Sequence, residues 1–352
     1  MNRASTGSQE GRGDPEDPGD PEGGTVRRLV FAGEAIVDLV MWVPALPERG
    51  GDMIATSAGP AVGGGFNIMA AAARQGLPVL YAGGHGRGPW GDLVRSALAG
   101  EGIAVLRPPD DRADTGFDVA MVERDGERTF VTSLGAETLR EPGSWDAVPA
   151  GPGDAVYVSG YGLAAAGSGA VLGEWAAALP DGVLLFVDPG PLVAEIPAGV
   201  LGPVQARCDW WSCNQREARL STGVADPAGA AHRLLTRDDL LTRDGRPARV
   251  TANGRPAAAG APGVIVRAGA AGCVVAHGDR LSLVPAPTVD PVDTTGAGDA
   301  HSGVFLAALA DGLTPEDAAF RANVAAALST TQMGPATAPT RAELDARLAP
   351  AR

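Results

Sequence analysis

From Arg27 onward, short runs of apolar residues alternate with longer segments in which apolar and polar positions recur with a helical period. The apolar runs are rich in Val, Leu and Ile and end at Gly, Pro, Ser or Asn, as buried strands do. This alternation predicts a doubly wound α/β fold, with a parallel central sheet, helices on both faces and right-handed crossovers. The predicted strands are RLVFAG, PVLYAGG, AVYVSG, GVLLFVDPG, DWWSCN and GVIVRAG.

Two segments depart from the βαβ pattern and predict a second, smaller sheet. Residues 37–60 have a strand pattern with no following helix, and residues 115–134 alternate around an Asp125-Gly126 turn, which is typical of a hairpin. We expect these segments to form a sheet beside the substrate crevice that closes over it as a lid. The segment CVVAHGDRLSLVPA predicts another hairpin, at the far edge of the central sheet.

The N-terminal segment differs from the rest of the chain. Up to Thr25 it carries six acidic and two basic residues and no apolar run, so it is not a signal peptide. We expect residues 1–26 to form a disordered acidic tail and residues 27–350 to form one domain.

Composition excludes several classes of protein. The net charge of −14 and the pI of about 4.7 argue against a nucleic-acid or membrane partner, because both need a basic field. All 28 basic residues are Arg, so the lysines of P-loop enzymes, protein kinases and Schiff-base enzymes are missing. A phosphate ligand would have to be neutralised by helix N-termini, backbone N–H groups or a metal.

The cysteines and histidines give no metal signature. Cys208, Cys213 and Cys273 have no ligand spacing, and the odd number of thiols fits a reducing cytoplasm, where we expect the protein to be. The uncharged run of residues 155–173 is interrupted by Gly, Ser and Tyr and predicts no membrane span.

The stretch PVDTTGAGDAHSGVFLAAL carries the strongest chemical signal. Gly296, Ala297 and Gly298 let backbone N–H groups approach an anion closely, and the dipole of the following helix adds positive charge. Such an anion hole suits a transferring phosphoryl group. A carboxylate beside it, Asp299, is disfavoured unless it acts as a general base. The alternative interpretation is an ordinary helix cap packed by glycines.

The segment DTTGAGDAHSGVF also resembles the C-terminal signature of the ribokinase family, the PfkB-type carbohydrate kinases. The resemblance covers residues 27–348 and implies a ribokinase-like kinase domain with a β-sheet lid. It implies ATP-dependent phosphorylation of a hydroxymethyl group on a small sugar or sugar-like substrate, with a nucleoside as the alternative acceptor. The other segments that resemble the family, in the same order, are VGGGFNIMAAAARQG, NQREARL, VIVRAGAAGCVV and RANVAAALSTTQ.

The resemblance assigns roles on the acceptor side. It makes Asp299 the general base and the amides of Gly296 to Gly298 the anion hole. A carboxylate and an amide can accept from and donate to vicinal hydroxyls, although Asp38 alone could be a turn residue and Asn67 an N-cap. The glycine signature, Gly63 to Asn67, is one residue shorter than in the family or shifted by one, which leaves open which glycine lines the sugar. The expected acceptor-binding residues are Asp38, Gly64, Gly65 and Asn67.

The resemblance also assigns a nucleotide side. Its Asn-x-x-Glu pair organises Mg²⁺ and phosphates, with Glu217 acting on the metal through water, whereas the pair alone would be an unremarkable helix start. A monovalent cation is left open, and His301 is expected either to pack in the helix or to contact the substrate. The expected ATP-binding residues are Asn214, Glu217, Arg267, Gly269, Gly272 and Asn323.

Two other functions compete with this interpretation. Residues Gly86 to Gly91 satisfy G-x-G-x-x-G, and Asp110 follows at the distance of a ribose-binding acid, as in an NAD-dependent oxidoreductase. That motif does not follow the first strand, and no catalytic His–acid pair accompanies it. A non-catalytic sugar-binding protein is disfavoured because Asp299 and its anion hole are intact. We expect a small-molecule sugar or nucleoside as partner, with the lid offering a surface for a homodimer.

Overall fold

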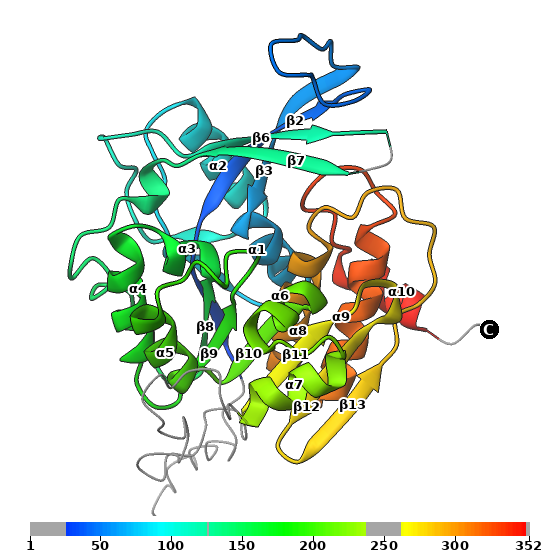
Figure 1. The fold of residues 1–352 in the computed structure, drawn as a ribbon. Coiled ribbons are helices and arrows are strands. Elements are labelled where there is room, and N and C mark those ends of the chain that lie inside the picture. Colours follow the sequence, from blue (N-terminus) through cyan, green and yellow to red (C-terminus); the bar gives the residue numbers. More distant parts are fainter. Residues whose placement is uncertain (1–25, 125–126, 237–261, 350–352) are drawn as a thin grey trace, which may run out of the picture.

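The computed structural model describes residues 26–349, except for 125–126 and 237–261. These residues form a nine-stranded sheet with helices on both faces and a separate four-stranded sheet that lies across the top of the view in Figure 1. The predicted α/β fold with a small second sheet is confirmed. The tail up to Thr25 and the Asp125-Gly126 turn lie outside the described residues.

The central sheet has the strand order β13-β12-β11-β10-β9-β8-β1-β4-β5. Neighbours from β11 to β5 pair in parallel, whereas β12 and β13 are antiparallel, which confirms the hairpin predicted at the far edge. The strands are β1 (Arg28–Ala32), β4 (Val79–Tyr81), β5 (Ala104–Val105), β8 (Asp154–Ser159), β9 (Leu184–Asp188), β10 (Trp210–Asn214), β11 (Gly263–Arg267), β12 (Cys273–His277) and β13 (Arg280–Val284).

Both faces of the inner strands of this sheet are buried, which explains why these strands are almost continuously apolar. In β1, Leu29 and Phe31 pack with one group of helices and Val30 and Ala32 with another, because successive side chains point to opposite faces. The first group is α1 (Gly65–Arg74), α2 (Pro89–Gly100), α8 (Ala297–Ala310), α9 (Pro315–Ser329) and α10 (Arg341–Leu348). The second is α3 (Gly160–Ala164), α4 (Ser168–Ala177), α5 (Ala198–Arg207), α6 (Gln215–Thr222) and α7 (Pro227–Thr236). Over the described ranges, none of the helices has the length and apolar character needed to cross a membrane.

The carboxyl ends of five neighbouring parallel strands place polar side chains at one edge of the sheet. Glu34 follows β1, Ser159 ends β8, and Asp188 ends β9. Asn214 ends β10 and Arg267 ends β11. In an open α/β sheet this edge is where ligands bind.

The second sheet, the lid, has the order β3-β2-β6-β7. Its strands are β2 (Ala35–Trp42), β3 (Ser57–Gly64), β6 (Phe117–Val122) and β7 (Arg128–Ser133), and β2 pairs with β6 in parallel. One face packs on α2, where the rings of Phe117 and Trp90 lie 5.9 Å apart. Strand β3 passes directly into α1 at Gly65, so the glycine signature joins the lid to a helix of the central domain. Closure of the lid and a homodimer through it stay predictions.

Candidate active site

Asp299 lies in the first turn of α8 and meets Asn67 of α1. Gly296 begins the helix in the left-handed conformation, with φ 72°. Further along α8, a Cβ on Gly303 would lie 2.4 Å from the Ile68 carbonyl oxygen, so the missing side chain lets α8 and α1 approach closely. Asn67 Nδ2 consequently donates to Asp299 Oδ2 at 2.9 Å.

The backbone amides before Asp299 are not equivalent. The Ala297 N–H donates to the Thr294 carbonyl at 3.3 Å. In the described part of the chain, the N–H groups of Gly296 and Gly298 have no protein acceptor. Two of the three amides predicted for the anion hole are therefore free for a ligand, next to the positive end of the α8 dipole.

The surroundings of Asp299 raise the pKa of its carboxyl group. Its pKa is raised to about 6, mainly by burial and also by the charge of Asp188. The hydrogen bond from Asn67 and the charge of Arg267 act in the opposite direction. A carboxylate with this pKa is ionised at neutral pH and is more basic than an ordinary Asp.

A cavity of about 540 Å³, the acceptor cavity, lies between the lid and the carboxyl ends of the strands. All the residues expected to bind the acceptor line it together with Asp299. A Cβ on Gly63 would lie 2.1 Å from Asp38 Oδ2, which identifies Gly63 as the glycine that makes room for this carboxylate. The expected lining residues are Asp38, Gly64, Gly65 and Asn67.

A second cavity of about 440 Å³, the nucleotide cavity, lies on the other side of the segment Thr294 to Asp299, which contributes residues to both cavities. Gly272 has φ 94°, and a Cβ there would meet the Val284 carbonyl oxygen at 2.1 Å, so this turn requires glycine. Asn323 is buried and its Nδ2 donates to the Val284 carbonyl at 2.9 Å, which holds this side of the cavity in place. His301 is buried and its ring stacks on Phe305, but it also lines this cavity, so its role stays open. The expected residues in the lining are Asn214, Gly269, Gly272, Ala297, Gly298 and Asn323.

Arg267 lines both cavities and lies between them. Its Nη1 donates to Asp188 Oδ2 at 2.8 Å, and also to the hydroxyls of Ser212 (2.7 Å) and Ser302 (3.1 Å). Its Nη2 lies 3.8 Å from Glu217 Oε2. Only Nη1 is hydrogen-bonded in the described part of the structure, so Arg267 organises the junction of the two cavities and keeps Nη2 and Nε for a ligand. Its predicted contact with ATP stays a prediction.

Asn214 and Glu217 form a capping box at the start of α6. The Asn214 side chain accepts from the Glu217 N–H at 2.9 Å, and Glu217 Oε2 accepts from the Asn214 N–H at 2.8 Å. Locally, the motif is therefore an ordinary helix start, as its sequence alone suggests. Glu217 is also buried and lines the acceptor cavity, and its pKa is raised by burial and by Asp188.

The divalent metal that the family resemblance implies would have no cage of direct protein ligands within the described ranges. Among the described residues, no three His, Cys, Asp or Glu side chains are grouped as metal ligands. Glu217 and Asp188 supply oxygen donors at the junction of the cavities, and Mg²⁺ commonly keeps several waters and takes one or two carboxylates. The residues present thus fit the water-mediated role that the resemblance implies.

Several acidic residues of the site were not predicted from the sequence. Asp188 ends a buried strand, and this position at the sheet's ligand-binding edge was a usable signal. Glu34 also follows a strand, lines the acceptor cavity and accepts from the Ser159 hydroxyl at 2.6 Å. Asp118 lines the cavity from strand β6 of the lid. A single acid in an alternating strand does not indicate a binding site by itself.

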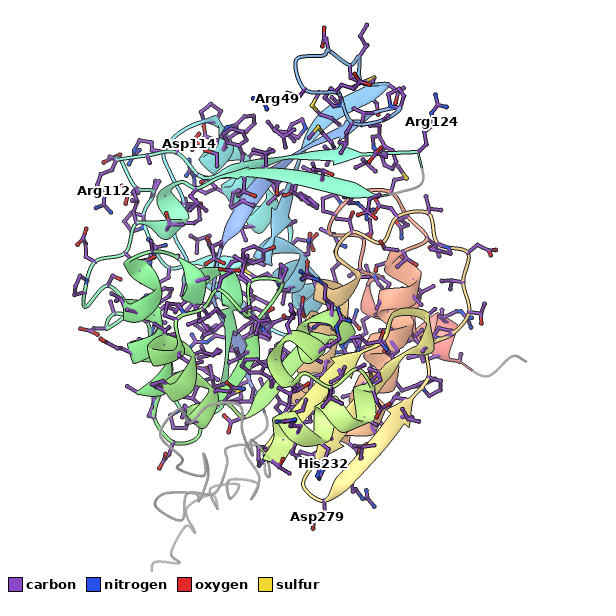
Figure 2. All side chains as sticks on the ribbon, viewed as in Figure 1. Arg49, Arg112, Asp114, Arg124, His232 and Asp279 are labelled. Carbon is purple, nitrogen blue, oxygen red and sulfur yellow. The ribbon has the colours of Figure 1, made fainter. Side chains whose placement is uncertain are left out.

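The glycine motif at Gly86 to Gly91 has a structural explanation that does not involve a dinucleotide. The N–H groups of Trp90 and Gly91, at the start of α2, donate to the two carboxylate oxygens of Asp114 at 3.0 and 2.9 Å. Figure 2 shows Asp114 beside this helix. A Cβ on Gly86 would lie 2.3 Å from the Asp114 Cα. The position that a pyrophosphate would need is taken by a protein carboxylate, so the oxidoreductase alternative loses its binding site.

Comparison with known proteins agrees with this geometry. The model of the pfkB family of carbohydrate kinases matches residues 26–341. The chain belongs to this family. It is 33% identical over 325 residues to a protein of Escherichia coli (strain K12) named uncharacterized sugar kinase YegV, covering 92% of this chain and 95% of that one.

Solved structures show the same fold. The ribokinase of Giardia lamblia superimposes with a TM-score of 0.74 at 21% identity, over 91% of this chain and 99% of that chain. A Burkholderia thailandensis nucleoside kinase in complex with inosine gives a TM-score of 0.70 at 21% identity, over 91% and 95% of the two chains. The predicted family, fold and enzyme class, an ATP-dependent carbohydrate kinase, are confirmed.

Proposed function

We propose that the enzyme transfers the γ-phosphoryl group of ATP to a hydroxymethyl group of a small sugar or sugar-like acceptor. The observation that carries this proposal is the position of one loop, Thr294 to Asp299, between two cavities. Asp299 faces the acceptor cavity, whereas Ala297 and Gly298 face the nucleotide cavity. A base and an anion hole on opposite sides of one helix start suit an in-line transfer between the two ligands.

In this mechanism Asp299 accepts the proton of the attacking hydroxyl, since its raised pKa makes it a stronger base than an ordinary carboxylate. Asn67 holds the Asp299 carboxylate in place through the hydrogen bond to Oδ2. The free N–H groups of Gly296 and Gly298 would stabilise the charge on the transferring group. Mg²⁺ that arrives with ATP would be held through water by Glu217 and Asp188 and would neutralise phosphate charge.

On the acceptor side, Asp38 and Asn67 would hold the acceptor hydroxyls beneath the lid, which would exclude water from the reaction. The lid is tied to the catalytic loop by an ion pair between Arg128 of β7 and the buried Asp293. Asp293 also accepts from the N–H groups of Thr295 and Gly334. This connection gives lid position a direct effect on the loop that precedes α8. A monovalent-cation requirement stays a prediction.

The decisive experiment is Asp299→Asn in an ATP-consumption screen across pentoses, hexoses and nucleosides. We expect the wild type to consume ATP with at least one sugar, and Asp299→Asn to lower kcat by about 10²–10⁴-fold while ATP affinity changes little. Asp290→Asn is the matched control, because Asp290 is exposed and lines neither cavity. Wild-type turnover retained in Asp299→Asn would remove Asp299 from the role of base. Turnover of nucleosides alone would reassign the acceptor.

A further inference from the structure

Two carboxylates of the lid, Asp38 and Asp118, lie side by side. In the parallel pairing of β2 with β6, Asp38 is directly opposite Asp118, so the two side chains point to the same face of the sheet. Both line the acceptor cavity, and each is only 7% exposed. Asp118 lies in turn opposite Thr132 of β7, which also lines the cavity.

This arrangement is unfavourable for the sheet itself. Like charges directly opposite one another destabilise a pair of strands. Burial raises the pKa of Asp38 to about 7, with contributions from the charges of Asp118 and Asp299, and burial raises that of Asp118 to about 6. Of the described residues that line the cavity, Arg267 is the only cation, and it is held by Asp188. No neighbouring positive charge therefore compensates the pair.

The free polar atoms around this pair are hydrogen-bond acceptors. Asp118 Oδ1 is buried without a hydrogen-bond partner in the described part of the structure, and Asn67 Oδ1 is in the same state. A buried polar atom without a partner in a ligand cavity points to a partner supplied by the ligand. Hydroxyl groups provide the donors that these oxygens lack, whereas a carboxylate or phosphate provides none.

We propose that Asp118 is a second acceptor-binding residue, which acts with Asp38 to select an uncharged polyol and to exclude sugar acids and sugar phosphates. The inference rests on the proposed function. An acceptor that carries an anionic group would bring a further negative charge into a cavity that is already acidic, and like charges across a binding interface strongly suppress the wrong partner. An uncharged acceptor instead donates hydroxyl protons to both carboxylates.

The wild-type enzyme tests the selectivity directly. Matched acceptors keep a free hydroxymethyl group and the same open-chain or ring form, and one member carries the charge: ribitol against ribonate, glucitol against gluconate, and fructose against fructose 6-phosphate. For the pair whose neutral member is turned over, we expect kcat/KM at least about 100-fold lower for the anion. Equal kcat/KM for both members would overturn the charge selectivity and leave the kinase function standing. Failure to consume ATP with any sugar or nucleoside would instead overturn the proposed function, and this inference with it.

Asp118→Asn tests the residue, with Glu123→Gln as the matched control, because Glu123 is an acid of the same lid hairpin that lines neither cavity. We expect Asp118→Asn to raise the KM of the neutral acceptor by about 10- to 100-fold while kcat changes by less than about threefold. The preference against the matched anion should fall in the same variant. Glu123→Gln should leave both unchanged.

Folding of the variant is followed by thermal unfolding, and Asp118→Ser, which is smaller and also uncharged, serves if Asp118→Asn does not fold. An unchanged acceptor KM and an unchanged preference in a folded Asp118 variant would overturn the role of this residue.

Discussion

The two cavities that meet at Arg267 differ sharply in charge. No Asp or Glu occurs among the described residues that line the nucleotide cavity, whose walls are mostly Gly, Ala, Pro and Thr. The acceptor cavity, in contrast, is lined by seven carboxylates. They are Glu34, Asp38, Asp118, Glu137, Asp188, Glu217 and Asp299.

This difference shows how an enzyme of net charge −14 can accommodate a polyanionic nucleotide. The nucleotide cavity offers few positive side chains, but it keeps acids away and presents backbone N–H groups and a helix N-terminus. On the selectivity proposed above, the carboxylates of the acceptor cavity would disfavour a phosphate that entered it. The difference in charge would thus direct the anionic nucleotide and the uncharged acceptor to different cavities, independently of their shapes.

The largest effect on this arrangement is expected at the glycine that separates the cavities. A Cβ on Gly296 would combine a positive φ of 72° with a distance of 3.2 Å to Asn67 Nδ2, which holds Asp299. We expect Gly296→Ala to lower kcat by about 100-fold, since small displacements of catalytic groups are costly. At Gly298, φ is not positive and the nearest atoms, in the Arg267 side chain, are 3.6 Å away. Gly298→Ala should therefore cost about tenfold or less. Steady-state kinetics of the two variants measure this order, and the reverse order would contradict it.

An intermediate effect is expected from pH. The pKa of Asp299 is raised to about 6, chiefly by burial. A general base must be deprotonated, so kcat should be constant above neutral pH and fall as pH drops through about 6, reaching about a tenth at pH 5. The profile of kcat at saturating ATP and acceptor measures this. A kcat that is unchanged between pH 5 and 8 would speak against Asp299 as the titrating base.

The smallest effect is expected from placing an acid in the acid-free cavity. Thr288 is exposed and lines the nucleotide cavity. Thr288→Glu should raise the KM of ATP by severalfold, as one partly screened charge near the phosphates costs about 1 kcal/mol. Thr288→Gln has a similar shape without the charge and should leave this KM unchanged. Equal effects of Glu and Gln would mean that the cavity responds to side-chain size and not to charge.

Much of the fold was predictable because its signals are local. The buried strands appear as apolar runs, and the start of α8 is marked by Gly296 to Gly298 in front of an acid. The family resemblance pointed to Asp38 and Asn67, and the local glycine pattern pointed to Asp299; the structure brings all three to one cavity. Asp118 could not be placed in this way, because its significance depends on the register between β2 and β6, two strands that are far apart in the chain.

The motif at Gly86 to Gly91 shows that a local signal can also suggest a site that the fold does not form. Its spacing fits a dinucleotide site, yet the helix start that it precedes is capped by Asp114, a residue of a different loop. A spacing rule contains no information about which distant side chain fills a site. The same holds for Arg267, whose donors are directed by Asp188, Ser212 and Ser302 from other elements.

The sequence by itself determined the order of elements, the exclusion of lysine-dependent chemistry and the position of a carboxylate beside a glycine-rich helix start, because each can be identified without knowing which distant residues meet. Only the tertiary structure decided which carboxylates share the acceptor cavity, which amides remain free and how the two cavities differ in charge. The physical reason is that desolvation and Coulomb interactions depend on distances between residues that the chain keeps far apart and folding brings together.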